Sequence, residues 1–217
     1  MTVLNVFIGQ PKPGRYDDVV EMSRTANKVI ERHGAQNIRT VAATVSGAAY
    51  GNIVSVCEFD DLEAWGGWLD AVLADEEIVT LLGQLRGENT PYLTQSTGVV
   101  MEVPLGRQRA ANGRVVATFM SAPVPGRYQA AVALAGQGFE LLERHGARNC
   151  RLFAQQANGL QPDVLISAVE FDSVKAYGKT LNAMTSDPAG QSLLELIQSS
   201  DSPMRMLSSD IYTEIPA

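Results

Sequence analysis

The sequence Pro-Gly-Arg-Tyr stands at residues 13–16 and again at residues 125–128, and this repetition decides the organisation of the chain. The second copy lies 112 positions after the first. Further pairs keep the same spacing: Glu31–Ala35 with Glu143–Ala147, Glu58–Asp60 with Glu170–Asp172, and Glu102 with Glu214. Because these pairs align without a gap, we interpret the chain as two copies of one domain.

A short polar segment separates the two copies. We assign a first repeat to residues 1–104, a linker to residues 105–112 and a second repeat to residues 113–217. A linker of this length spans at most about 28 Å when extended. We therefore expect the two repeats to be close neighbours.

Each repeat follows the order β-α-β-β-α-β. In the first repeat, strand-like residues occupy 3–8, 37–45, 52–59 and 92–103, and helical apolar spacing occupies about 19–33 and 62–72. This order is the split βαβ, ferredoxin-like arrangement, with both helices on one face of an antiparallel sheet. The other sheet face would be bare. We predict an α+β fold in which two tandem ferredoxin-like repeats pack sheet to sheet.

Composition narrows the function classes. The chain has 217 residues, 17 Lys+Arg against 24 Asp+Glu, a net charge of −7 and 45% hydrophobic residues. An acidic surface repels nucleic acid phosphates and anionic lipid, so we expect neither nucleic acid nor membrane partners. No apolar run approaches the roughly 20 residues of a membrane span, and we expect a cytoplasmic protein. Two His and two Cys are too few for most metal sites, and we expect no metal and no cofactor.

The tandem arrangement resembles the dimeric α+β barrel superfamily, which includes antibiotic-biosynthesis monooxygenases, NIPSNAP-type proteins and stress-responsive A/B-barrel proteins. The resemblance rests on the PGRY entry to the first helix, the EFD end of the third strand and the aromatic residues of the second helix. It covers both repeats and implies an intramolecular barrel in which the chain carries its own dimer. Both a monomer and a homodimer remain open.

The same resemblance implies a pocket for a small hydrophobic or aromatic molecule between the sheet and the helices of a repeat. In similar proteins a first-strand Asn and a Trp of the second helix belong to its lining. Asn5 is the catalytic candidate because the second copy has Ala117 at its position. The expected ligand-binding residues are Asn5, Tyr16, Trp65, Trp68, Tyr128 and Tyr177.

Two residue types recur in both copies and favour structural roles. His33 and His145 precede a glycine at the end of the first helix of each repeat, where we predict structural, partly buried histidines. A general base or a metal ligand is the alternative.

Charged residues recur within predicted strands. Arg39 and Glu58 lie on the two arms of a predicted hairpin, as do Arg151 and Glu170 in the second copy. We predict one cross-strand ion pair in each repeat, with a substrate clamp as the alternative.

The sequence leaves open whether the chain is an enzyme. The first hypothesis is a cofactor-independent monooxygenase or cyclase for a small aromatic or polyketide-like compound, with Asn5 donating to a developing oxyanion and Trp65 and Trp68 stacking on the ring. The second is a non-catalytic ligand-binding or assembly module. The third is a haem-binding protein, which we disfavour because residues 75–90, where such proteins supply an axial His, contain none.

Overall fold

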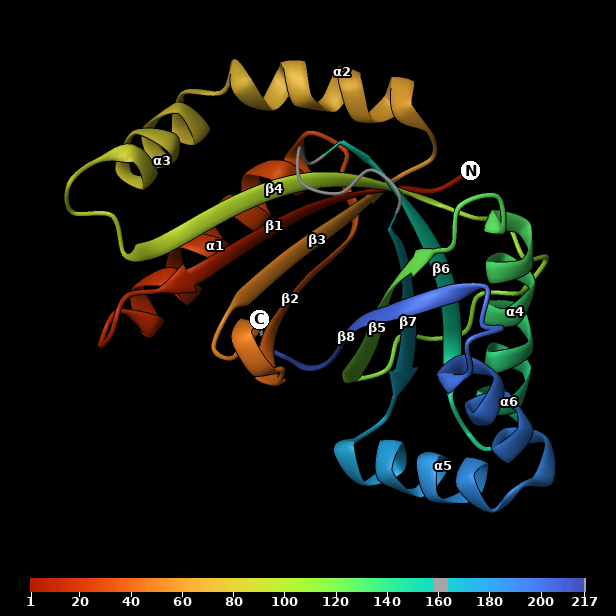
Figure 1. Ribbon diagram of the computed structural model, residues 1–217. Coiled ribbons are helices and arrows are strands. Elements are labelled where there is room, and N and C mark those ends of the chain that lie inside the picture. The colour runs from red at the N-terminus through yellow and green to blue at the C-terminus, as the bar shows by residue number, and fades with distance from the viewer. Residues whose placement is uncertain (158–163, 217) are drawn as a thin grey trace.

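The computed structural model describes residues 1–157 and 164–216 (Figure 1). The first half consists of β1 (Val3–Pro11), α1 (Tyr16–Arg32), β2 (Gln36–Val45), β3 (Ile53–Phe59), α2 (Leu62–Leu73), α3 (Glu76–Arg86) and β4 (Tyr92–Glu102). The second half repeats this order as β5 (Val115–Pro123), α4 (Tyr128–Arg144), β6 (Arg148–Ala157), β7 (Leu165–Phe171), α5 (Val174–Ser186), α6 (Pro188–Gln198) and β8 (Met204–Glu214). The predicted β-α-β-β-α-β order is confirmed in both halves, with a further helix, α3 or α6, inserted before the last strand.

Helix starts follow directly from short polar side chains in the sequence. The side chain of Asp61 accepts a hydrogen bond from the backbone of Ala64 at the start of α2, and Ser173 caps α5 in the same way. Asp75 and Asp187 cap α3 and α6. Such caps satisfy backbone N–H groups that a helix terminus leaves without a partner. Each second helix is thus followed by a separate, capped third helix.

The eight strands form one closed barrel in the order β1-β3-β2-β8-β5-β7-β6-β4. Within the first half the antiparallel order is the ferredoxin-like one, β4-β1-β3-β2. Two antiparallel pairs, β2 with β8 and β4 with β6, join the halves. The helices lie outside the barrel, three beside each half (Figure 1). The predicted α+β fold of two packed ferredoxin-like repeats is confirmed.

The residue that follows the last strand of each half forms a backbone hydrogen bond with the other half. The backbone N–H of Val103 donates to the carbonyl of Leu152 at 2.8 Å, and that of Ile215 donates to the carbonyl of Thr40 at 2.9 Å. These two contacts occupy equivalent positions in the two repeats. The halves are therefore interlocked by backbone hydrogen bonds as well as by packing.

The two hydrophobic cores differ in continuity. The second half has one large cluster of buried side chains, in which Phe139, Leu152 and Phe171 are among the most enclosed. In the first half the buried side chains fall into one cluster around Trp68 and one around Tyr92, while Leu4 and Val100 join Phe153 of the second half in a further cluster. Among residues 1–157 and 164–216, no helix is both long enough and apolar enough to cross a bilayer.

Candidate functional site

The separation between the two first-half clusters is a cavity of about 460 Å³, which we call the first-half cavity. It lies between the β1-β3-β4 face and the helices α1, α2 and α3, and apolar side chains make up most of its wall. Its volume falls within the roughly 300–1,000 Å³ typical of small-molecule sites. This is the location that the sequence analysis predicted for a pocket.

We call the sheet side of the first-half cavity its floor. The two-residue period of the strands determines which side chains form this floor. Asn5 and Phe7 of β1 and Ser55 and Cys57 of β3 all line it. Asn5 is paired in register with Cys57, and Phe7 with Ser55. Because alternate residues of a strand share a face, these side chains form two adjacent rows on the helix side of the sheet. The floor therefore combines an apolar surface with a few polar groups.

Asn5 is the side-chain amide that β1 contributes to the floor. Its Oδ1 accepts a hydrogen bond from the indole Nε1 of Trp65 at 3.3 Å. An indole N–H only donates, so this contact assigns the oxygen and leaves the amide NH₂ as the remaining polar group of this cavity-lining side chain. Among the described residues, that NH₂ has no hydrogen-bond acceptor. It is available to donate to an oxygen atom of a bound molecule.

The two tryptophans have different places. Trp68 lines the cavity, is 7% exposed and donates its indole N–H to the carbonyl of Ile30 at 3.3 Å. Its ring packs on Phe59 with a centroid distance of 4.8 Å. Trp65 is not among the lining residues and instead holds Asn5. Of the two, Trp68 presents a ring to the cavity and Trp65 orients the amide.

The three tyrosines of the sequence prediction are not brought to the first-half cavity. Tyr16 and Tyr128 begin α1 and α4 and are each 42% exposed. Tyr177 lies in α5 and packs edge-on against Phe171. The residue that sequence reasoning missed is Tyr92, which is 4% exposed and lines the cavity.

Two titratable groups of the cavity wall, Cys57 and Tyr92, are held in their neutral forms. Burial, with a smaller effect of the Glu58 charge, raises the pKa of the Cys57 thiol to about 12. Burial also raises the pKa of Tyr92, against a smaller opposing effect of Ser23. Neither group is ionised at neutral pH, so neither supplies a base or a thiolate nucleophile there.

In the second half, a bulky apolar side chain replaces one polar residue of the cavity wall and a small apolar one replaces another. Phe139, 2% exposed, stands where the first half has Asn27, and Ala117 stands where it has Asn5. Asn27 lines the first-half cavity and donates to the hydroxyl of Thr40 at 3.0 Å. The two repeats therefore differ in sequence at positions that line the cavity. The core is divided in the first half, which has the polar residues, and continuous in the second half, which has the apolar ones.

The two histidines link helix ends outside the cavity. His33 Nε2 lies 2.8 Å from Asp75 Oδ2, and His145 Nε2 lies 3.0 Å from Asp187 Oδ2. Each aspartate is also the N-cap of a third helix. Neither histidine lines the first-half cavity. The residues present therefore do not supply the histidine ligand that a haem in this cavity would take.

These contacts predict an acid dependence of stability. The hydrogen bond from His33 and then that from Arg32 lower the pKa of Asp75 below its ordinary value of 3.8. The stabilisation from a lowered pKa is complete well above 3.8 and is lost as the pH falls through the lowered value. We expect Asp75→Asn to be less stable than the wild type at pH 7, with a difference that shrinks at lower pH.

Urea unfolding of wild type and Asp75→Asn at several pH values measures this difference. Asp60→Asn, at an exposed position before α2, is the matched control and should show a small effect at every pH. A difference that stays constant from pH 7 down to below 3.8 would show that the carboxylate charge is not what stabilises this contact.

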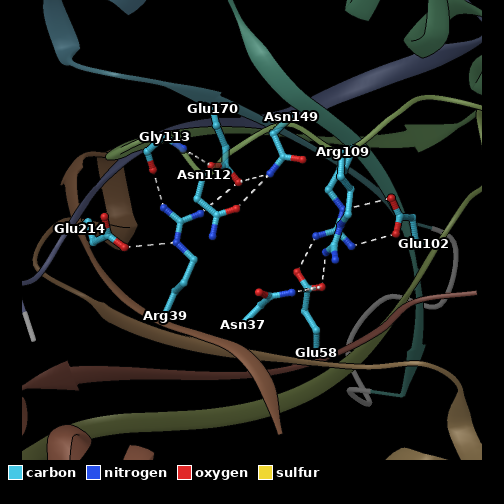
Figure 2. Close-up of polar contacts among 11 residues, drawn as sticks. Asn37, Arg39, Glu58, Glu102, Arg109, Asn112, Gly113, Asn149, Glu170 and Glu214 are labelled. Carbon is cyan, nitrogen blue, oxygen red and sulfur yellow. Dashed lines mark hydrogen bonds and ion pairs between the residues drawn. The ribbon is translucent and has the colours of Figure 1, made fainter.

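A second polar cluster lies between the two halves, and Figure 2 shows it. Nη1 of Arg39 lies 3.0 Å from Oε1 of Glu170, and Nε of Arg39 lies 3.4 Å from Oε1 of Glu214. Arg151 is the equivalent arginine of the second repeat. Its Nη1 lies 2.6 Å from Oε1 of Glu58, and its Nη2 lies 2.8 Å from Oε2 of Glu102. We call these residues the barrel network.

The partners in the barrel network differ from those predicted. The sequence analysis paired Arg39 with Glu58 and Arg151 with Glu170 inside each half, but each arginine pairs with carboxylates of the other half. The reason is barrel closure, which brings β2 against β8 and β4 against β6. The four residues are ion-paired, and the pairing joins the halves.

The linker takes part in the barrel network. Arg109 pairs with Glu58, and the backbone N–H of Gly113 donates to Glu170 at 2.6 Å. Burial acts to raise the pKa of Glu102, but the hydrogen bond and charge of Arg151 hold that pKa below its ordinary value. Every carboxylate of the network thus has a cationic partner, which is what buried charges require. This arrangement fits a structural role.

Comparison with known proteins identifies the fold. No protein-family model and no curated relative matches the sequence. Among solved structures, an anthrone oxidase-like protein superposes with a TM-score of 0.67 at 17% identity, covering 99% of this chain and 91% of that chain. A monooxygenase-like protein from Lactobacillus acidophilus gives a TM-score of 0.58 at 14% identity, covering 99% and 93%.

A chlorite dismutase variant from Candidatus Nitrospira defluvii superposes with a TM-score of 0.55 at 11% identity, covering 99% of this chain and 91% of that chain. At these identities the similarity establishes the fold and no activity. The resemblance expected from the sequence is thus confirmed: the chain has the fold of the dimeric α+β barrel superfamily, with both halves of the barrel on one chain.

Proposed function

We propose that this protein is a monooxygenase-type enzyme that oxidises a small aromatic compound in the first-half cavity, with molecular oxygen as its co-reactant. The observation that carries the proposal is the free amide NH₂ of Asn5, fixed by Trp65 in an otherwise mainly apolar cavity. An oriented amide donor in a mainly apolar site is suited to an oxyanion. The fold similarity to an anthrone oxidase-like protein and to a monooxygenase-like protein supports the same class.

The chemistry of the cavity wall limits the substrate. Cys57 and Tyr92 are protonated at neutral pH because burial raises the pKa of each. The substrate must therefore be acidic enough to lose its proton to water, as an enol or a phenol does. Asn5 then donates to the resulting oxyanion, and the ring of Trp68 packs on the aromatic system. The mainly apolar wall strengthens the interaction of the amide donor with a negative charge.

Anthrone is a suitable test substrate. Its ring CH₂ group loses two hydrogens and gains one oxygen atom from O₂, while the second oxygen atom leaves as water and anthraquinone is formed. We expect purified protein under air, with no added cofactor, to consume one O₂ per anthrone faster than buffer alone. An oxygen electrode and the absorbance of the quinone measure this reaction. A rate equal to that of buffer would contradict the proposal.

The second candidate function is binding without chemistry, and the residue types of the cavity wall favour it. Among the described lining residues no carboxylate or histidine is present to move a proton. A carrier needs the cavity and the Asn5 donor but no base. If anthrone and anthraquinone quench the tryptophan fluorescence without any acceleration of oxygen uptake, this second function replaces the first.

A further inference from the structure

Tyr92 lies over a glycine at the end of the first-half cavity opposite Asn5. A Cβ added at Gly9 would lie 2.1 Å from Cε1 of Tyr92, so the ring fills the space that any side chain at position 9 would take. The ring also packs edge-on against Phe7, with a centroid distance of 5.7 Å and an interplanar angle of 82°. Gly9 and Phe7 together fix the position of the ring.

The barrel fold does not require this arrangement. The second half has Ser121 at the position of Gly9 and Met204 at the position of Tyr92. The corresponding strands pair in the same way there, with β5 against β8. A residue pair needed for folding should occur in both repeats. The Gly9–Tyr92 pair occurs only in the half that contains the cavity.

The strand geometry places Tyr92 and Asn5 at opposite ends of the floor. Asn5, Phe7 and Gly9 share one face of β1, and four residues of a strand span about 13 Å. The apolar ring of Phe7 lies between the two polar ends. This separation suits an elongated, flat molecule about as long as three fused aromatic rings.

The hydroxyl of Tyr92 is suited to bind a neutral oxygen function. Burial raises its pKa, so the group is a neutral hydroxyl that both donates and accepts hydrogen bonds. Of the described side chains, Ser23 interacts with this hydroxyl, and the Ser23 proton is already donated to the carbonyl of Val19 at 2.9 Å. Bonding capacity at the Tyr92 oxygen therefore remains for a ligand.

We infer that Tyr92 is a second anchor, and that among flat apolar molecules the cavity binds most tightly those that carry an oxygen function at each end. One oxygen is bound by the amide of Asn5 and the other by the hydroxyl of Tyr92. This inference rests on the proposed function, whose site it shares. It adds a length requirement and a second polar contact, and it makes Tyr92 a specificity-determining residue.

Two ligands that differ by one hydroxyl test the inference. In 2,6-dihydroxyanthraquinone the hydroxyls stand at opposite ends of the long axis, and 2-hydroxyanthraquinone lacks one of them. The central carbonyls are common to both. Binding is followed by quenching of the fluorescence of Trp65 and Trp68, the two tryptophans of the chain.

The variants are Tyr92→Phe, which keeps the ring over Gly9 and removes the hydroxyl alone, and Asn5→Ala. Tyr50→Phe, at a position that is 69% exposed, is the control. We expect the two-ended ligand to bind roughly five- to tenfold more weakly to each of the two cavity variants. The one-ended ligand should be weakened by only one of them, because it has a single terminal oxygen. The control should leave both affinities unchanged.

Three other results would overturn the inference, and they differ in whether the proposed function is retained. If Asn5→Ala weakens the two-ended ligand and Tyr92→Phe does not, the second anchor is wrong while the proposed function stands. If both variants weaken both ligands equally, the Tyr92 hydroxyl does not bind the terminal oxygen by which the ligands differ, and the length requirement is wrong. If neither ligand quenches the wild type, the proposed aromatic site fails together with the anchor.

Discussion

Replacement of Asn5 by alanine is expected to lower kcat/KM for oxygen uptake with anthrone by roughly 10²- to 10³-fold, the usual loss when one oxyanion donor is removed. The amide NH₂ of Asn5 is the donor that faces the cavity without a protein acceptor, because Trp65 occupies its oxygen. The effect should fall on kcat more than on KM, since the oxyanion forms only as the reaction proceeds.

Two further variants make this test specific. Trp65→Phe keeps an aromatic ring in α2 and removes the indole N–H, so we expect a loss of roughly tenfold or less from a misplaced amide. Asn182→Ala changes an exposed amide of α5 and should leave the rate unchanged. Urea unfolding of each variant shows whether the fold is kept. A folded Asn5→Ala protein with the wild-type rate would remove Asn5 from the mechanism.

Replacement of Arg151 by alanine is expected to destabilise the protein by about 3–5 kcal/mol, as is typical when one partner of a buried ion pair is removed. Arg151 is 8% exposed, bonds both Glu58 and Glu102, and stacks over Phe153 at 4.8 Å. Its loss leaves two carboxylates at the joint between the halves. Arg109 still pairs with Glu58, so we expect a value near the lower end of the range.

The free energy of urea unfolding measures this effect. The matched control is Arg148→Ala in the same strand, because Arg148 pairs with Asp172 at the surface, where side-chain exposures are 35% and 65%. Exposed pairs typically contribute about 0–1 kcal/mol. If Arg151→Ala costs no more than Arg148→Ala, the barrel network does not hold the halves together.

The fold could be predicted because its evidence is local and is present twice. The PGRY turn, the glycines Gly34 and Gly146 after the first helices, and the alternation within each strand recur at one fixed spacing. Each of these signals acts over a few residues. Closure of the barrel was inferable from the bare sheet face that a single repeat would leave.

The ion-pair partners could not be predicted, because they depend on contacts between distant strands. Arg39 and Glu58 are neighbours in the hairpin, and this local geometry suggested their pairing. The register of β2 against β8 brings Glu214 and Glu170 to Arg39 instead. Only the closed barrel contains that information.

The candidate site was predictable in part. The substitution of Asn5 by Ala117 in the second copy pointed to the correct strand face. The sequence could not show which of Trp65 and Trp68 faces the cavity, since residues three apart lie on nearly the same helix face. The contact of Tyr92 with Gly9 was missed, although the paired change to Met204 and Ser121 is visible in the sequence.

The presence of both halves on one chain allows them to diverge. In a barrel built from two identical chains, every substitution occurs in both halves at once. Here position 27 is Asn while its counterpart, position 139, is the buried Phe139, so filling one core leaves the other open. An open cavity lowers stability through lost packing, and the filled half offsets that loss through the shared sheet. Selection for a stable barrel and selection for a particular ligand can therefore act on different residues.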